Sequence, residues 1–220
     1  MTDLNTFQDK LGEAIVESKV DVLKFADWLK ARHAPSRNAR IAEINPEMAT
    51  PDKPGSGMTN ARAGEILNEA TREGKAEDYW RLAEDYIDPL LAETLTIGLD
   101  SGLITPEEFQ RLRTHYEHYI PLRGKEVTGN GIEASGPEWQ RSLGRTSEAP
   151  TEQVLPYIFQ QYFNIVYRAE KNKVAQSLRQ FVIENPNDEI KLGSPDYVRR
   201  LTNLVDDRQI VQLVNNPNWY

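Results

Sequence analysis

Apolar residues recur every three or four positions through residues 6–32, the spacing that one face of an α-helix requires. The apolar positions are Leu11, Ile15, Val16, Val22, Leu23, Ala26, Trp28 and Leu29. This pattern predicts a first helix over that range. Pro35 suits the first turn of a second, short helix, because the N–H that proline lacks would be unused there, and Pro46 closes that helix.

A loop and a third helix are expected next. Residues 50–58 read "TPDKPGSGM", and their content of Pro, Gly and Ser predicts a loop. Thr59 is the expected N-cap of a helix that runs to about Glu73 and stops at Gly74.

A fourth helical pattern precedes Gly102 and places Tyr79, Leu82, Ala83, Tyr86, Leu90 and Leu91 on one side. Its regularity is interrupted at Asp88-Pro89. Either the helix kinks at this point, or Asp88 caps a new helix that has Pro89 in its first turn.

The sequence "TPEEFQRLRTHY" carries the strongest local signal, a capping box formed by Thr105 and Glu108 with Pro106 at the first helical position. The helix is expected to run from 106 to about His118, before Pro121. The same device recurs at Ser135, Pro137 and Glu138. Between the two, residues 124–136 hold four glycines and predict a flexible loop.

The longest helical pattern extends from Thr151 to Ile183, with Pro156 near its start. A short helix is expected from Ser194 to about Val205, and residues 208–214 ("RQIVQLV") have a strand-like pattern. A lone strand cannot satisfy its own backbone, so an end of this kind suggests a piece cut from a longer polypeptide.

These elements predict an all-α fold, an elongated multi-helix bundle with at most a short C-terminal β element. We expect an N-terminal helical region (1–123), a Gly-rich flexible loop (124–136) and a C-terminal helical region with the long helix (137–220), truncated from a longer chain.

Composition narrows the classes of function. The chain has no cysteine, which excludes disulfides, thiolate chemistry and Cys-based zinc sites. The net charge of −8 argues against a general nucleic-acid-binding surface. Ten Asp or Glu and four Lys or Arg lie in residues 60–100, and the remainder is nearly neutral, so a local basic patch stays possible. No secretory signal and no apolar run of ~20 residues is present, so we expect a soluble chain without a membrane span.

The candidate chemistry lies in "HYEHYIPLRG" (115–124), which holds His115 and His118. Two histidines at i and i+3 can share a helical face, but Glu117 does not complete a His-Glu-x-x-His pattern and no third ligand is near. We therefore expect no metal and no cofactor. The favoured interpretation is that this segment closes a helix and docks against "RHAPSRN" (32–38) as a structural corner, its arginines pairing with the acidic residues of 60–100.

The alternative is a functional cluster. If His33 joins His115 and His118, then Arg32, Arg37, Arg40 and Arg123 supply positive charge, and the group could bind phosphate or act in acid–base chemistry. The candidate catalytic residues on that hypothesis are His33, His115, His118 and Arg123. "PGSGMT" is no phosphate loop, because no Lys follows its glycines and no strand precedes it.

Three stretches together resemble a known family. "WLKARHAPSRNARIAEINP", "GSGMTNARAGEIL" and "HYEHYIPLRG", in this order and spacing, are similar to a helical region of the large polyvalent proteins of phages, prophages and conjugative elements. The resemblance covers about residues 25–125 and continues more loosely to "NPNWY". It implies a connecting region without assigned catalytic residues, in chains that enter the recipient cell with the DNA.

The function expected from this resemblance is that of a non-catalytic scaffold or interaction module of a polyvalent or internal virion protein. Its partners would be proteins: the rest of a larger polypeptide, virion proteins or host defence proteins. It would reside in the virion, in the bacterial host cytoplasm, or in both. Two alternatives remain: a His/Arg-based enzyme acting on nucleic acid or a phosphate ester, and an acidic inhibitor of a host defence protein whose helices mimic the charge of DNA.

Overall fold

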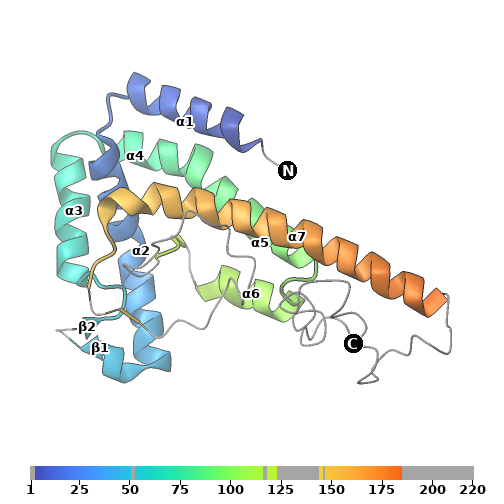
Figure 1. Cartoon of the computed structure of the whole chain (residues 1–220). Coiled ribbons are helices and arrows are strands. Elements are labelled where there is room, and N and C mark those ends of the chain that lie inside the picture. The colour runs from blue at the N-terminus through green and yellow to red at the C-terminus, as the bar shows by residue number, and fades with distance from the viewer. Residues whose placement is uncertain (1–2, 51–52, 116–117, 123–143, 146, 185–220) are drawn as a thin grey trace.

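The fold of the chain was obtained as a computed structural model, which describes residues 3–50, 53–115, 118–122, 144–145 and 147–184. Its elements follow one another as α1 (Leu4–Glu17), α2 (Val22–Ile44), η1 (Pro46–Met48), β1 (Ala49–Thr50), β2 (Lys53–Pro54), α3 (Asn60–Arg72), α4 (Ala76–Leu82), η2 (Ala83–Ile87), α5 (Asp88–Asp100), α6 (Pro106–His115), η3 (Thr151–Gln153) and α7 (Val154–Glu184). The prediction of an all-α fold is confirmed (Figure 1).

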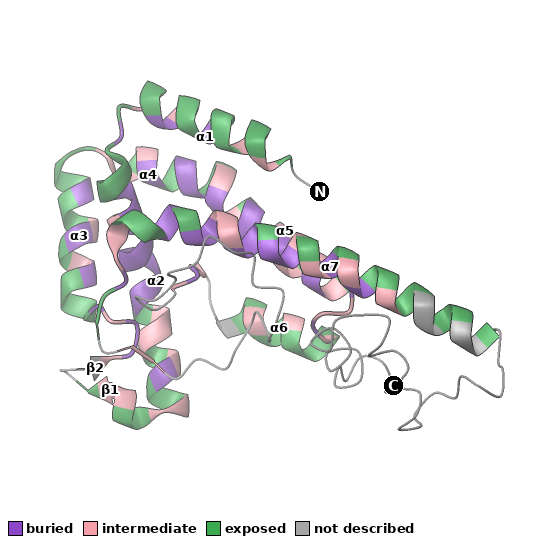
Figure 2. Cartoon of the chain, in the orientation of Figure 1, coloured by how far each residue is buried: buried purple, intermediate pink, exposed green. Residues whose placement is uncertain are grey.

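The core is centred on α2. Phe25, Trp28, Leu29 and Ala31 are at most 1% exposed, and they are enclosed by apolar residues of α1, α3, α4, α5 and α7 (Figure 2). α5 and α7 pack along each other. The ring of Phe7 on α1 packs edge-on against the ring of Phe159 on α7, with centroids 6.2 Å apart. This contact attaches the first helix to the last described one.

The expected single helix over 6–32 is two helices. The chain leaves α1 through Lys19, which has a φ of 50°, and starts α2 after Asp21. The Asp21 carboxylate accepts hydrogen bonds from the N–H groups of Leu23 and Lys24 at 2.9 and 3.1 Å, which is an N-cap. The apolar period persists across the break, so periodicity alone could not reveal it.

The expected helix start at Pro35 is also wrong, because α2 continues through this residue to Ile44. Proline removes one intrahelical hydrogen bond, that to the carbonyl of Ala31. Residues 31–34 are buried, whereas Pro35 itself is exposed. Tertiary packing of the buried turn therefore outweighs the local cost of the proline.

Neither expectation for Asp88-Pro89 describes the helix fully. α4, η2 and α5 form one continuous helical run, and η2 is a π-helical turn placed directly before Asp88. Pro89 occupies the first turn of α5, as one alternative proposed, but the Asp88 side chain makes no cap. A π-turn provides the wider spacing that a helix can use where a proline N–H is missing.

The capping box of α6 is confirmed. The Thr105 hydroxyl accepts from the N–H of Glu108 at 3.2 Å, and the Thr105 N–H donates to the Glu108 carboxylate at 3.0 Å. The helix ends at His115, close to the expected 118. Thr59 likewise caps α3, which ends at Arg72 before Gly74, and the long helix predicted over 151–183 is α7.

Strands among the described residues are confined to a minimal hairpin, in which Ala49 pairs with Pro54 and Thr50 with Lys53. This hairpin overlaps the segment 50–58 that was predicted to be a loop. The Gly-rich loop (124–136), the second capping signal and the C-terminal β element lie outside the described residues. No helix in the described ranges is sufficiently long and apolar to cross a bilayer.

Candidate functional site

The segment 118–122 packs against α2, as the sequence predicted for "HYEHYIPLRG" and "RHAPSRN". The ring of Tyr119 meets the imidazole of His33 edge-on, with centroids 5.9 Å apart and planes at 85°. Ile120 is 1% exposed. On the other side, the Tyr119 hydroxyl accepts a hydrogen bond from the Gln161 amide at 3.4 Å, so the segment also contacts α7.

His33 is fully enclosed in this corner. Its side chain is 1% exposed and hydrogen-bonds to the backbone of His118. Burial, and after it the positive charge of Arg37, together lower the pKa of His33 to about 3. The imidazole is therefore neutral at pH 7, and a base this weak and this enclosed is poorly suited to proton transfer with a substrate.

The guanidinium of Arg32, the residue before His33, lies against two tryptophan rings. Its guanidinium carbon lies 5.2 Å from the ring centroid of Trp28 and 5.3 Å from that of Trp80. Its two terminal nitrogens bind the Asp88 carboxylate at 2.9 and 2.6 Å. The His118 ring then stacks edge-on against Trp80, with centroids 5.3 Å apart. The aromatic faces and the charge of Arg32 are thus engaged within the protein.

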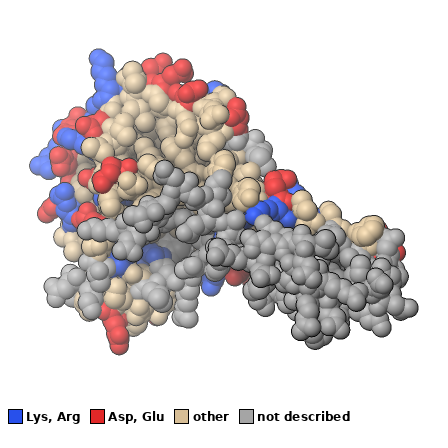
Figure 3. Space-filling view, viewed as in Figure 1, with Lys and Arg blue, Asp and Glu red and all other residues tan. Residues whose placement is uncertain are grey.

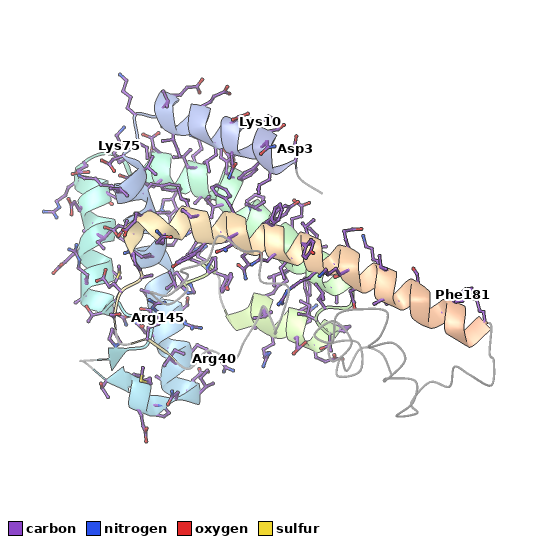
Figure 4. All side chains as sticks on the ribbon, in the orientation of Figure 1. Asp3, Lys10, Arg40, Lys75, Arg145 and Phe181 are labelled. Carbon is purple, nitrogen blue, oxygen red and sulfur yellow. The ribbon has the colours of Figure 1, made fainter. Side chains whose placement is uncertain are left out.

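The other predicted site residues have different positions. Arg40, which is labelled in Figure 4, pairs with Glu43 at 2.7 Å. Arg37 lies close enough to His33 to lower its pKa. His115 is the last residue of α6, and its side chain, like all of Arg123, is outside the described residues. The structure therefore brings together His33 and His118, with Arg32 and Arg37 beside them.

A buried lysine was missed by the sequence analysis. The Lys30 ammonium, 4% exposed, binds the Asp27 carboxylate at 2.7 Å, the Thr151 hydroxyl at 2.9 Å and the Ala149 carbonyl at 3.0 Å. Two of these partners are more than a hundred positions away along the chain, so only an i, i+3 pair with Asp27 was visible locally. The network attaches the start of α7 to α2.

The "PGSGMT" segment has a structural explanation. The Asn38 side chain accepts from the Ser56 N–H at 2.7 Å and donates to the Met58 carbonyl at 2.8 Å. Gly57 has a φ of 89°, and a Cβ there would lie 2.1 Å from the Ser147 carbonyl oxygen. The glycines and the asparagine therefore hold the backbone of 55–58 against residues 144–145 and 147–148, and they do not form a phosphate cradle.

The side chains around His33, Arg32 and Lys30 pack against one another and form ion pairs within the protein. Among the described residues, no group of three or more His, Cys, Asp or Glu side chains is placed to hold a metal ion. Comparison with known proteins found no matching family model, no matching curated protein and no matching solved structure.

Proposed function

We propose that this chain is a non-catalytic helical scaffold and interaction module of a phage-derived large polyvalent or internal virion protein, delivered with the genome into the host. The observation that carries the non-catalytic part is the state of the His33 corner. The neutral, buried imidazole of His33 and the Arg32–Asp88 pair join helices that are far apart in sequence. Of the candidate catalytic residues, His33 and His118 are used as internal contacts in the described part of the chain.

The setting in a phage-derived protein is supported by the three stretches that resemble the polyvalent family. Their residues have defined roles in the fold: Arg32 and His33 lie in the corner, Asn38 binds Ser56, and Gly57 allows the close approach of Ser147. These structural roles are sufficient to explain why the three stretches contain these residues, without a catalytic role for any of them.

Delivery is tested with a split luciferase. The small complementing fragment is fused to the chain in its parent reading frame, and particles or donor cells carrying the fusion are applied to recipients that express the large fragment. Luminescence in recipients is expected, and a fusion with a translation stop before the fragment is the control. Absence of luminescence, with the fusion present in the particles, contradicts delivery.

The non-catalytic assignment has its own test. The purified chain and its His33→Gln variant are assayed on single-stranded DNA, RNA and a phosphodiester chromogen. We expect no turnover by either protein. Turnover by the wild-type chain that is lost in His33→Gln, at a temperature at which both proteins are folded, would instead establish the enzyme alternative.

A further inference from the structure

The apolar pattern that predicted one helix over residues 6–32 is not fully explained by the two helices that form there. Seven apolar residues follow one another at spacings of three, four, four, seven, three and four positions. They are Leu4, Phe7, Leu11, Ile15, Val22, Phe25 and Leu29. In one continuous α-helix they would lie within about 80° of one another around the axis. In the structure the chain bends between α1 and α2, and Val22 is 44% exposed. The sequence is therefore compatible with a second, continuous form of this helix.

The junction between α1 and α2, residues 18–21, contains neither Gly nor Pro. Lys19 has a φ of 50°, in the left-handed region that a residue with a Cβ adopts at a cost, and Asp21 is extended, with a ψ of 120°. If both residues took helical angles, the strain at Lys19 would be relieved. The N–H groups of Leu23 and Lys24, which now donate to the Asp21 carboxylate, would donate to backbone carbonyls. The continuous form therefore leaves no backbone donor of α2 unpaired.

α1 is attached to the other helices by apolar contacts. Leu11 and Ile15 are buried, and the ring of Phe7 packs edge-on against Tyr86 of η2 and Phe159 of α7, with centroids 5.9 and 6.2 Å apart. α1 lies beside α4 at the edge of the fold, and its outward surface carries charged side chains (Figures 1 and 3). In the described part of the chain, no side chain of α1 forms a hydrogen bond or an ion pair with another helix. Release of α1 therefore breaks no buried polar contact along its length.

We propose that α1 is exchanged between two copies of this chain. The junction straightens, α1 and α2 become one helix, and each α1 occupies the site on η2 and α7 of the other copy. The exchanged α1 makes the same contacts in the partner copy that it makes in its own, so its apolar side and the site beneath it are both covered again. Exchange of α1 goes beyond the proposed function and does not rest on it, since every readout below uses the purified chain.

The contacts that differ between the two forms are those of the junction. In the bent form Lys75 donates to the Ser18 carbonyl at 2.8 Å, and Arg81 donates to the Ser18 hydroxyl at 3.1 Å. Exchange breaks these two hydrogen bonds and removes the Asp21 cap, whereas it relieves the left-handed conformation of Lys19. Substitutions at the junction should therefore shift the equilibrium between monomer and exchanged dimer, because contacts elsewhere are equal in the two states.

Three variants separate the two forms. Val22→Pro fixes the bent form: Val22 is the first residue of α2, where proline fits, and in a continuous helix this proline would clash with the Ser18 carbonyl and remove a hydrogen bond. Asp21→Ala removes the cap that only the bent form uses. Asp3→Ala is its matched control, since it removes a similar cap at the start of α1, which both forms keep.

Sedimentation equilibrium of the full chain measures the dissociation constant of the dimer. We expect a reversible monomer–dimer equilibrium for the wild type, the same constant for Asp3→Ala, and no dimer for Val22→Pro. Asp21→Ala should tighten the dimer at least tenfold, because each of its two protomers no longer loses a cap worth a factor of about five.

A further variant keeps the test decisive if Val22→Pro does not fold. Lys19→Gly adopts a positive φ without strain and is unfavourable inside a helix, so it should weaken the dimer at least tenfold. Circular dichroism melting checks that each variant is folded.

The position of α1 is measured with spin labels. The chain has no cysteine, so Lys10→Cys and Ala39→Cys, both at exposed positions, give one labelled site on α1 and one on α2. In a continuous helix the two Cα atoms would be about 44 Å apart. Double electron–electron resonance on labelled chain, diluted with an excess of unlabelled chain, should show this distance in the dimer and a shorter one in the monomer.

Three results would overturn the exchange of α1. The first is the absence of a dimer in both the wild type and Asp21→Ala, at the highest concentration at which they stay in solution. The second is a dimer that persists unchanged in Val22→Pro and Lys19→Gly, since it would use another surface. The third is a dimer whose spin-label distance equals that of the monomer, because α1 would then still be bent back onto its own chain.

Discussion

Arg32 and Asp88, which are 56 positions apart in the sequence, form a two-pronged ion pair with N–O distances of 2.9 and 2.6 Å. The Arg32 side chain is 2% exposed and that of Asp88 is 32% exposed. The pair joins α2 to the first residue of α5, at the place where a π-turn and Pro89 modify the helix. Asp88 therefore stabilises this junction through a tertiary contact with α2 in place of a local cap.

Removing the carboxylate should be costly. Asp88→Asn leaves the guanidinium of Arg32 buried without an anionic partner, and we expect the free energy of unfolding to fall by about 3 kcal/mol. The matched control is Glu43→Gln, which breaks the Arg40–Glu43 pair at a glutamate that is 65% exposed and should cost at most about 0.5 kcal/mol. Urea denaturation of the three proteins measures both values. Similar losses in the two variants would show that the Arg32 site is hydrated.

The pKa of His33 predicts a stability that depends on pH. In the unfolded chain its imidazole takes up a proton below about pH 6.5, whereas in the folded chain it stays neutral down to about pH 3. Because the unfolded state binds more protons in this window, the free energy of unfolding decreases as the pH falls from 6.5 toward 3. Above pH 6.5 the imidazole is neutral in both states, so its titration no longer changes the free energy of unfolding. At pH 5 the expected loss is about 2 kcal/mol.

The contribution of His33 is isolated by difference. Urea denaturation at pH 7.5 and pH 5 is compared for the wild-type chain and His33→Gln, which cannot titrate. The variant is expected to be less stable at pH 7.5, since it loses the contact with Tyr119, but its loss between the two pH values should be smaller by about 2 kcal/mol. Equal losses in both proteins would mean that His33 is not held neutral.

Gly57 is expected to be irreplaceable. Gly57→Ala places a Cβ 2.1 Å from the Ser147 carbonyl oxygen at a φ of 89°, so the backbone of Ser147 and Glu148 must move. We expect a loss of more than about 3 kcal/mol, enough to lower the melting temperature by at least about 6 °C. Gly64 on α3 has no atom within 4 Å of such a Cβ. Gly64→Ala should therefore stabilise the protein by up to about 1 kcal/mol. Thermal melts that rank the two variants in the opposite order would contradict this geometry.

Local signals account for much of the fold. The capping residues Thr59 and Thr105 and the stop at Gly74 each act within four positions, and the structure places these helix ends where they were predicted. The break before Asp21 and the continuation through Pro35 were not predicted. At Asp21 a capping carboxylate overrides an apolar period that continues on both sides, and at Pro35 the burial of the preceding turn overrides a local helix breaker.

The sequence predicted which two segments lie next to each other in the site, but it did not predict the individual contacts between side chains. Two proline-marked segments, each carrying histidine, suggested that "RHAPSRN" and "HYEHYIPLRG" meet, and the contact of His33 with Tyr119 confirms it. The partners of Lys30 and Gly57 were out of reach, because Thr151 and Ser147 are brought to them by the path of the chain into α7. The spacing of residues around Lys30 or Gly57 does not predict where the chain passes before α7.

Pro35 offers a last prediction, in which a substitution should increase stability. The residue lies inside α2 and is exposed, so it costs an intrahelical hydrogen bond without contributing to the core. Proline is about 3 kcal/mol less favourable than alanine in a helix interior, and the greater freedom of the unfolded alanine chain removes about 1 kcal/mol of that gain. Pro35→Ala should therefore raise the free energy of unfolding by about 2 kcal/mol. The control is Pro106→Ala at the first position of α6, where proline is well suited and the change should be neutral or destabilising by less than about 1 kcal/mol. If urea denaturation shows that Pro35→Ala is destabilised, then the local geometry that the proline imposes on α2 is needed to hold Arg32 and His33 in the corner.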